Sequence, residues 1–172
     1  FHADGVQALL KTPIDLSSGL VDAYTVSAHK IHALKGTGAL LVRQGVTLRP
    51  LLHGGGQELS LRAGTENTLG ILAFAEALEM GLPKQSENFE RIRQLRTAVL
   101  DGIRDMDGIA VHVPESFVPH IVSLTVEGVR GEVLARAMGE KGVMIGTGAA
   151  CSRGKLSRVL LECGVSRAQA EG

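Results

Sequence analysis

The short apolar run Ala23-Tyr24-Thr25-Val26 ends directly at the polar stretch Ser27-Ala28-His29-Lys30. A short run of this kind, rich in aromatic and β-branched residues, is typical of a buried strand. Open α/β sheets bind their ligands beyond the carboxyl ends of their strands. A lysine just past such a strand, beside a histidine, is therefore interpreted as an amine placed for chemistry.

A second reactive stretch lies far along the chain, at Gly146-Thr147-Gly148-Ala149-Ala150-Cys151. Its small residues are typical of an exposed loop, whereas cysteine is among the residue types most often buried in cores. Arg153 and Lys155 follow closely and would favour the thiolate of Cys151. Cys163, by contrast, shares an apolar helical face and is expected to be structural.

The first half of the chain predicts short strands, one long loop and two helices. Residues 1–7 are expected to be the tail of a strand whose beginning is missing, and further strands are expected at 21–27 and 39–42. The glycine-rich stretch 53–67 is too long for a simple connection, and loops of that length are usually functional or disordered. A helix apolar all round, and hence buried, is expected from Asn67 to the break at Pro83, before an amphipathic helix over 86–104.

In the second half, short predicted strands and helices alternate, as in a small α+β unit. Strands are expected at residues 111–113, 121–126 and 143–145, with helices over 131–141 and 156–163. Gly164 is well placed to end the last of these helices, and Ser166 with Gln169 has the spacing of a capping box. We place a domain boundary near residue 85, giving domains 1–85 and 86–172. The helix that begins at Ser166 is cut short at Gly172, so we expect a truncated C-terminus.

Charge and composition argue against several classes of protein. The formal net charge is zero, and no Lys/Arg cluster interleaved with aromatic residues marks a nucleic-acid surface. No apolar run reaches the length of a membrane span. The two cysteines make no disulfide framework, which favours a reduced, intracellular and cytoplasmic setting. No histidine or third cysteine lies close enough in sequence to predict a zinc site.

Asp4 also follows a presumed strand, which makes it a natural partner for Lys30. A lysine Schiff base with a buried aspartate is the arrangement that holds pyridoxal phosphate, because the carboxylate keeps the pyridine nitrogen protonated. His29 or the Ser27 hydroxyl could donate to the phosphate. The ordinary alternatives remain open: a solvated Lys30, a turn or N-cap carboxylate at Asp4, and a packed core histidine at His29.

Five segments, taken together and in order, resemble the cysteine desulfurases of the NifS/IscS-like branch of the class V aminotransferase superfamily. They are Asp4-Gly5-Val6-Gln7, Ser27-Ala28-His29-Lys30, His53-Gly54-Gly55-Gly56-Gln57-Glu58, Arg62-Ala63-Gly64-Thr65-Glu66-Asn67 and Gly146-Thr147-Gly148-Ala149-Ala150-Cys151-Ser152. The resemblance implies an α/β fold, that of a fold-type I pyridoxal-phosphate enzyme, normally a homodimer. The chain would contain part of the large cofactor domain and most of a small α+β domain.

The resemblance also implies a role for each cofactor-binding residue. Lys30 would form the Schiff base, and Asp4 would pair with the pyridine nitrogen. Gln7 would lie against the phenolic oxygen of the ring, and Ser27 and His29 would bind the phosphate.

Two further residues acquire roles by the same resemblance. Thr65 would reach the phosphate of the neighbouring subunit. Cys151 would attack the sulfur of L-cysteine, hold it as a persulfide and release alanine. A sulfur acceptor, such as an iron–sulfur scaffold protein, would then receive the sulfur.

Part of the family pattern has no counterpart in this sequence. The upstream half of the family, which supplies more phosphate ligands and a histidine stacked on the ring, is missing. So is the arginine that holds the substrate carboxylate, expected just beyond Gly172. We therefore expect residues 1–172 to be inactive alone. The alternatives are a selenocysteine lyase or another class V relative, and a non-catalytic scaffold that keeps the fold without the cofactor.

Overall fold

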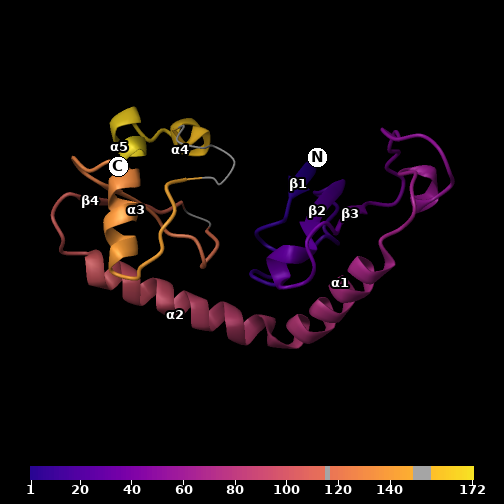
Figure 1. The fold of residues 1–172 in the computed structure, drawn as a ribbon, viewed down its shortest axis with the longest axis horizontal. Coiled ribbons are helices and arrows are strands. Elements are labelled where there is room, and N and C mark those ends of the chain that lie inside the picture. The colour runs from indigo at the N-terminus through magenta and orange to yellow at the C-terminus, as the bar shows by residue number, and fades with distance from the viewer. Residues whose placement is uncertain (115–116, 149–155) are drawn as a thin grey trace. The chain divides into compact units, whose positions relative to one another are not determined.

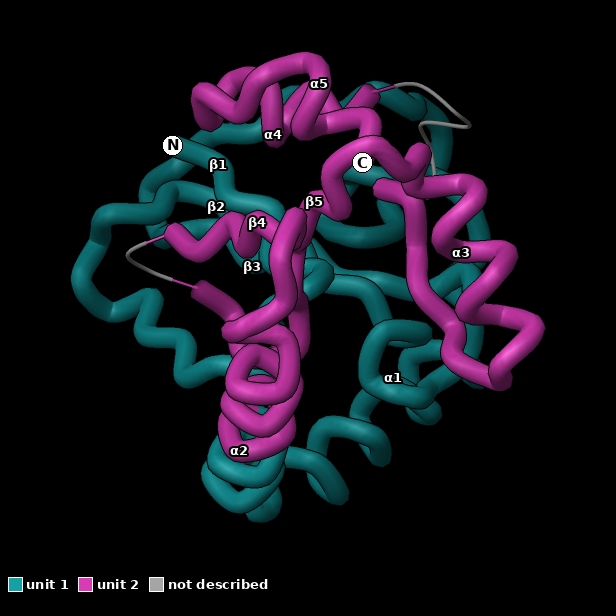
Figure 2. Tube along the Cα trace, turned by 90° about the vertical axis from the view of Figure 1, so that its left-hand side faces the viewer, with its two compact units in different colours: residues 1–92 teal, residues 93–172 magenta. Residues whose placement is uncertain are grey.

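The computed structural model describes residues 1–114, 117–148 and 156–172. The chain forms two compact units, residues 1–92 and 93–172 (Figure 2). The division falls within helix α2 (Gln85–Ile103), whose predicted span of 86–104 is confirmed. The predicted domain boundary near residue 85 lies at the first residue of this helix. That this boundary is the end of a cofactor domain stays a prediction.

The first unit is built on a sheet in the order β1-β2-β3, formed by β1 (His2–Asp4), β2 (Ala23–Ser27) and β3 (Gly38–Val42) (Figure 1). Strand β1 runs parallel to β2 with Asp4 opposite Thr25, and β3 is antiparallel to β2. The strands predicted at 21–27 and 39–42 are confirmed. The strand predicted over residues 1–7 ends at Asp4, so the prediction is wrong for its last three residues, because the backbone forms a turn from Val6 onward.

The core of this unit lies on one side of β2. Alternate residues Tyr24 and Val26 are buried, as the two-residue period of a strand requires. They pack with Ala28 and Ile31, which follow the strand, and with Phe74 from the next helix. The core thus extends from the strand into the segment that carries Lys30.

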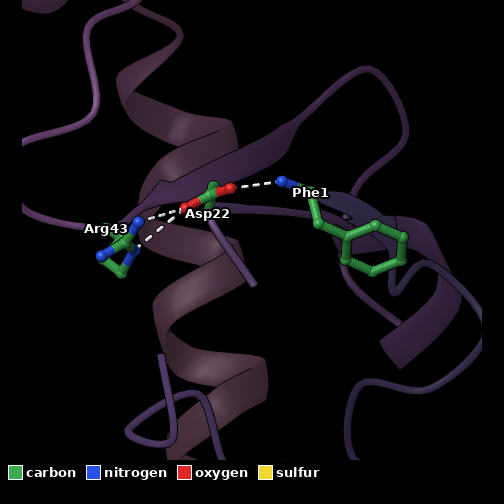
Figure 3. Close-up of polar contacts among 3 residues, drawn as sticks. All are labelled: Phe1, Asp22 and Arg43. Carbon is green, nitrogen blue, oxygen red and sulfur yellow. Dashed lines mark hydrogen bonds and ion pairs between the residues drawn. The ribbon is translucent and has the colours of Figure 1, made fainter. Parts of the chain in front are cut away.

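Asp22 links residues that flank the three strands of this sheet. Its carboxylate contacts the Phe1 amino group and the Arg43 guanidinium, with 3.0 Å between Arg43 Nε and Asp22 Oδ1 (Figure 3). The Phe1 amine and then Arg43 hold the pKa of Asp22 below its ordinary value. These contacts join residues before β1, before β2 and after β3.

Helix α1 (Thr68–Gly81) begins where the sequence predicts, with the Asn67 side chain accepting a hydrogen bond from Gly70 N at 3.1 Å. The expectation that it is buried all round is wrong. Phe74 reaches the core, but Leu69 is 75% exposed and Leu72 is 66% exposed. The described chain supplies a partner for one face only. Pro83 ends α1, but a 3-10 turn, η3 (Leu82–Lys84), leads directly into α2.

The second unit pairs β4 (Ile109–His112) with β5 (Ser123–Val126) in an antiparallel ladder. Its helices are α3 (Gly131–Glu140), α4 (Arg158–Glu162) and α5 (Arg167–Glu171). The strand predicted at 143–145 does not form. Val143 N instead donates to Met138 O at 2.9 Å and closes the end of α3, so this backbone is used by the helix terminus.

Two buried polar side chains organise the second unit. Arg96 from α2 donates to Ile121 O and lies 4.4 Å from the ring centroid of Phe117. Thr125 on β5 shares a hydrogen bond of 2.8 Å with His112 Nε2 and donates to Gln169 O. Arg96 and Thr125 therefore both have hydrogen-bond partners, as burial in a core requires.

The structure confirms the predicted signals at the ends of the last helices and contradicts the prediction for Cys163. Ser166 and Gln169 form the predicted capping box, and Gly164 adopts a left-handed φ of 83° just past α4. Helix α4 is shorter than the span predicted for it. Cys163 is exposed, so its expected structural role on an apolar face is wrong. Helix α4 has only five residues, and Cys163 lies just past its last residue.

Gly5 gives a direct test of the packing beneath the first strand end. A Cβ at this position would lie 1.8 Å from Tyr24 Cζ, inside the buried ring. Gly5→Ala should therefore destabilise the intact protein by about 2 kcal/mol in urea unfolding, because the ring must move. Gly102→Ala is the matched control, since nothing lies within 4 Å of its Cβ. Equal midpoints for the two variants would contradict this account of the core.

Candidate active site

The predicted cofactor residues gather at one edge of the first sheet. Asp4 is the last residue of β1, and Lys30 lies in the 3-10 turn η1 (Ala28–Ile31) directly after β2. Because β1 and β2 are parallel, their carboxyl ends meet at the same edge. The structure thus brings Asp4, Ser27, His29 and Lys30 to adjacent strand ends, where α/β sheets bind ligands.

The turn that carries Lys30 is anchored through Ala28, which is completely buried. Its N–H donates to Thr37 O at 3.0 Å, and its carbonyl accepts from Ala33 N at 3.2 Å. His32 ends the turn in the left-handed region with a φ of 70°. Lys30 is half-buried, and its side chain extends from this fixed backbone.

Ser27 and His29 form a polar pair beside Lys30. Ser27 Oγ and His29 Nδ1 share a hydrogen bond of 2.7 Å, which orients the imidazole. His29 is exposed, so the alternative of a packed core histidine is wrong. A hydroxyl and an imidazole next to a lysine are a chemically sensible set of ligands for a phosphate group.

Asp4 is exposed and has a local partner. Its Oδ1 accepts a hydrogen bond from Val6 N at 2.9 Å, so the turn role considered as an alternative is real. This contact occupies one oxygen of the carboxylate. Burial and then the charge of Asp4 raise the pKa of Tyr24. Gln7 follows in the same turn and is exposed.

Thr65 lies in the long loop and is not brought to this edge. It is exposed, and within the described ranges it makes no hydrogen bond with Asp4, Ser27, His29 or Lys30. The same loop contains a left-handed turn that the sequence did not predict, η2 (Glu58–Ser60), with φ values of 48°, 56° and 64°. Glycine is the residue type that favours such angles, and none of these three residues is a glycine, so the sequence did not indicate the turn.

Lys11 is a residue of this region that the sequence reasoning missed. Its Nζ donates to Lys30 O at 2.7 Å. Burial and then the nearby Lys30 charge lower the pKa of Lys11. The two lysines are 19 residues apart in sequence, and no spacing rule links them.

Cys151 lies outside the described residues, so its predicted role stays a prediction. Among the residues that the structure describes, no group of three or more His, Cys, Asp or Glu side chains could hold a metal ion. Within those same ranges, no helix combines the length and apolar character needed to cross a bilayer.

Comparisons with known proteins agree on one class of fold. The sequence profile of the class-V aminotransferases matches residues 1–168. A solved NifS-like protein superposes with a TM-score of 0.86 at 35% identity, covering 99% of this chain and 44% of the other. The fold is therefore that of the fold-type I pyridoxal-phosphate enzymes, and the chain belongs to the class-V aminotransferase family, whose members depend on this cofactor.

Within that family the chain is similar to cysteine desulfurases. A cysteine desulfurase of Gluconacetobacter diazotrophicus is 39% identical over 158 residues, which are 91% of this chain and 40% of that protein. The structure of SspA in complex with cysteine superposes with a TM-score of 0.72 at 31% identity, over 99% of this chain and 47% of SspA. The chain thus spans less than half the length of these relatives.

The donor set at the strand ends fits pyridoxal phosphate. The cofactor has an aldehyde, a pyridine nitrogen and a phosphate, and the sheet edge offers an amine, a carboxylate and a hydroxyl–imidazole pair. Lys30, Asp4 and the pair Ser27–His29 would hold these three groups respectively. Each kind of group on the cofactor therefore has a complementary side chain at one edge.

Proposed function

We propose that this chain is part of a pyridoxal-phosphate-dependent cysteine desulfurase, which converts L-cysteine to L-alanine and carries the sulfur on Cys151. One observation carries the proposal: Asp4 and Lys30 follow adjacent parallel strands, with the Ser27–His29 pair beside the lysine. The similarity to relatives named cysteine desulfurase supports the activity. The structural likeness to SspA, solved with cysteine, supports the substrate.

The residues at the sheet edge would share the work of binding and proton movement. When bound, the cofactor supplies an electron sink for bond changes at the substrate. Lys30 Nζ would move the α-proton of the amino acid, and Asp4 would keep a proton on the pyridine nitrogen. Ser27 and His29 would hold the phosphate, and Gln7 would contact the phenolic oxygen.

Cys151 would perform the sulfur chemistry. Its thiolate attacks the sulfur of L-cysteine, so a new S–S bond forms as the C–S bond of the substrate breaks. The carbon takes a proton and leaves as alanine, while the sulfur remains on the protein as a persulfide. The flanking glycine and alanine residues are typical of a segment able to carry that sulfur outward.

The remaining parts of the proposal concern partners and setting. The persulfide sulfur would pass to an acceptor such as an iron–sulfur scaffold protein, as the resemblance to the NifS/IscS-like branch implies. Thr65, exposed in its loop, would reach the cofactor phosphate of a second subunit in a homodimer. Two cysteines without a disulfide framework favour the reduced cytoplasm.

The intact polypeptide that contains these residues provides the test. Incubated with L-cysteine and a thiol acceptor, it should release alanine in catalytic amounts and form a persulfide. A strong preference for L-selenocysteine over L-cysteine would favour the selenocysteine lyase alternative. Absence of any cofactor absorbance and of alanine would favour a non-catalytic scaffold and contradict the enzyme.

A further inference from the structure

We propose that Lys11 is a positioning residue for Lys30, holding the backbone from which the Lys30 amine reaches the cofactor. The inference rests on the proposed cofactor-binding role of Lys30. Lys11 acts through the backbone of Lys30 and not on the cofactor itself. Nothing in the sequence motifs assigns it this role.

The contact itself is direct and charged. Lys11 Nζ donates to Lys30 O at 2.7 Å, and the bond is partly buried. Carbonyls at the end of a helical turn have no partner within the turn, and a side chain is one of the groups that can supply it. Hydrogen bonds from a charged donor are stronger than neutral ones. Lys11 therefore completes η1 at the residue that carries the reactive amine.

Packing holds the segment around Lys11 in a strained conformation. Leu10 adopts a left-handed φ of 59°, which costs energy for a residue with a branched side chain and persists only where its surroundings enforce it. A Cβ at Gly81 of α1 would lie 2.3 Å from Leu10 Cδ1, so the missing side chain at Gly81 lets Leu10 pack closely. Helix α1 thereby holds the turn that presents Lys11.

The residue after Lys11 is held as well. Gln85 Nε2, at the start of α2, donates to Thr12 O at 2.9 Å. Lys11 N donates to Ala8 O at 2.9 Å and closes the turn from the other side. The Lys11 backbone is thus fixed before its side chain reaches Lys30.

The surroundings of the two lysines strengthen the contact. Lys11 and Lys30 line a cavity of about 350 Å³ with Ala77 and Met80 of α1. The hydrogen bond from Lys11 to Lys30 is partly buried, so it is worth more there than in bulk solvent. The lowered pKa of Lys11, caused first by burial and then by Lys30, agrees with this proximity.

The test compares three variants of the intact protein, all prepared without cofactor: Lys11→Met, Lys11→Gln and Lys11→Arg. The measurement is the rate at which added pyridoxal phosphate gives the absorbance band of lysine-bound cofactor. Loss of a charged hydrogen bond should slow attachment about tenfold in Lys11→Met. Lys11→Gln should be intermediate, and Lys11→Arg should stay within about threefold of the wild-type rate because it restores a charged donor.

Lys84→Met is the matched control. Lys84 lines the same cavity but makes no hydrogen bond to Lys30 in the described part of the chain. Its attachment rate should equal that of the wild type. Thermal unfolding of all variants separates positioning from a general loss of stability. A purely structural role predicts that variants with equal Tm attach the cofactor at equal rates, whether or not arginine restores the hydrogen bond. If Lys11→Met does not fold, the comparison of Lys11→Gln with wild type decides.

Two different failures can be told apart. If Lys11→Met and Lys11→Gln attach the cofactor to Lys30 at the wild-type rate, the positioning role is wrong and the proposed function stands. If the wild-type protein attaches no cofactor, or attaches it to another lysine, the proposed function itself is wrong.

Discussion

Lys30→Ala in the intact protein should abolish covalent attachment of pyridoxal phosphate and lower alanine formation by about 10³-fold or more. The reason is that one amine both anchors the cofactor and moves the α-proton. Lys30 lies in the turn after β2, which the completely buried Ala28 anchors, whereas Lys35 lies outside this turn. The measurements are the absorbance of lysine-bound cofactor and the rate of alanine release.

Lys35→Ala is the control for this substitution. Lys35 is exposed and lies only a few residues further along the chain. It removes the same charge without touching the turn, so both the absorbance band and the rate should remain. Retention of the band in Lys30→Ala would contradict the assignment of the cofactor to this strand end.

Cys151→Ala should abolish persulfide formation while leaving the cofactor bound. The two functions separate because the sulfur carrier attacks the substrate and has no part in anchoring the cofactor. Alanine release should fall to background, and the absorbance band should remain at full intensity. The measurement is mass spectrometry of the intact protein after a short exposure to L-cysteine, which detects the added sulfur atom.

Cys163→Ala is the matched control, and a demanding one. Cys163 is exposed, so its thiol is accessible to adventitious sulfur. Exposure alone does not make a thiol reactive, because the thiolate must also be favoured. We predict full persulfide on Cys163→Ala. Equal persulfide on wild type and Cys151→Ala would overturn the assignment of Cys151.

The strand ends were the most predictable part of the chain. The buried alternation in β2 and the polar residues after it are local signals, and the structure places Lys30 where they predict. The N-cap of α1 and the capping box of α5 were also predictable, because each depends on residues within one turn.

Features that depend on distant contacts could not be predicted. The exposure of Leu69 and Leu72 depends on what packs against α1, which its apolar composition does not state. The segment 143–145 is apolar enough for a strand, yet Val143 is used to close α3. The contact from Lys11 to Lys30 arises from tertiary packing at Leu10 and has no sequence pattern.

The central claim is that Lys30 carries pyridoxal phosphate, and reduction followed by peptide mapping tests it most directly. Treating the intact cofactor-loaded protein with borohydride makes the lysine–cofactor bond permanent, and mass spectrometry then locates the modified lysine. We predict the added mass of the reduced cofactor on Lys30, with Lys11 and Lys35 unmodified. Modification of another lysine in place of Lys30, or of none, would contradict the account.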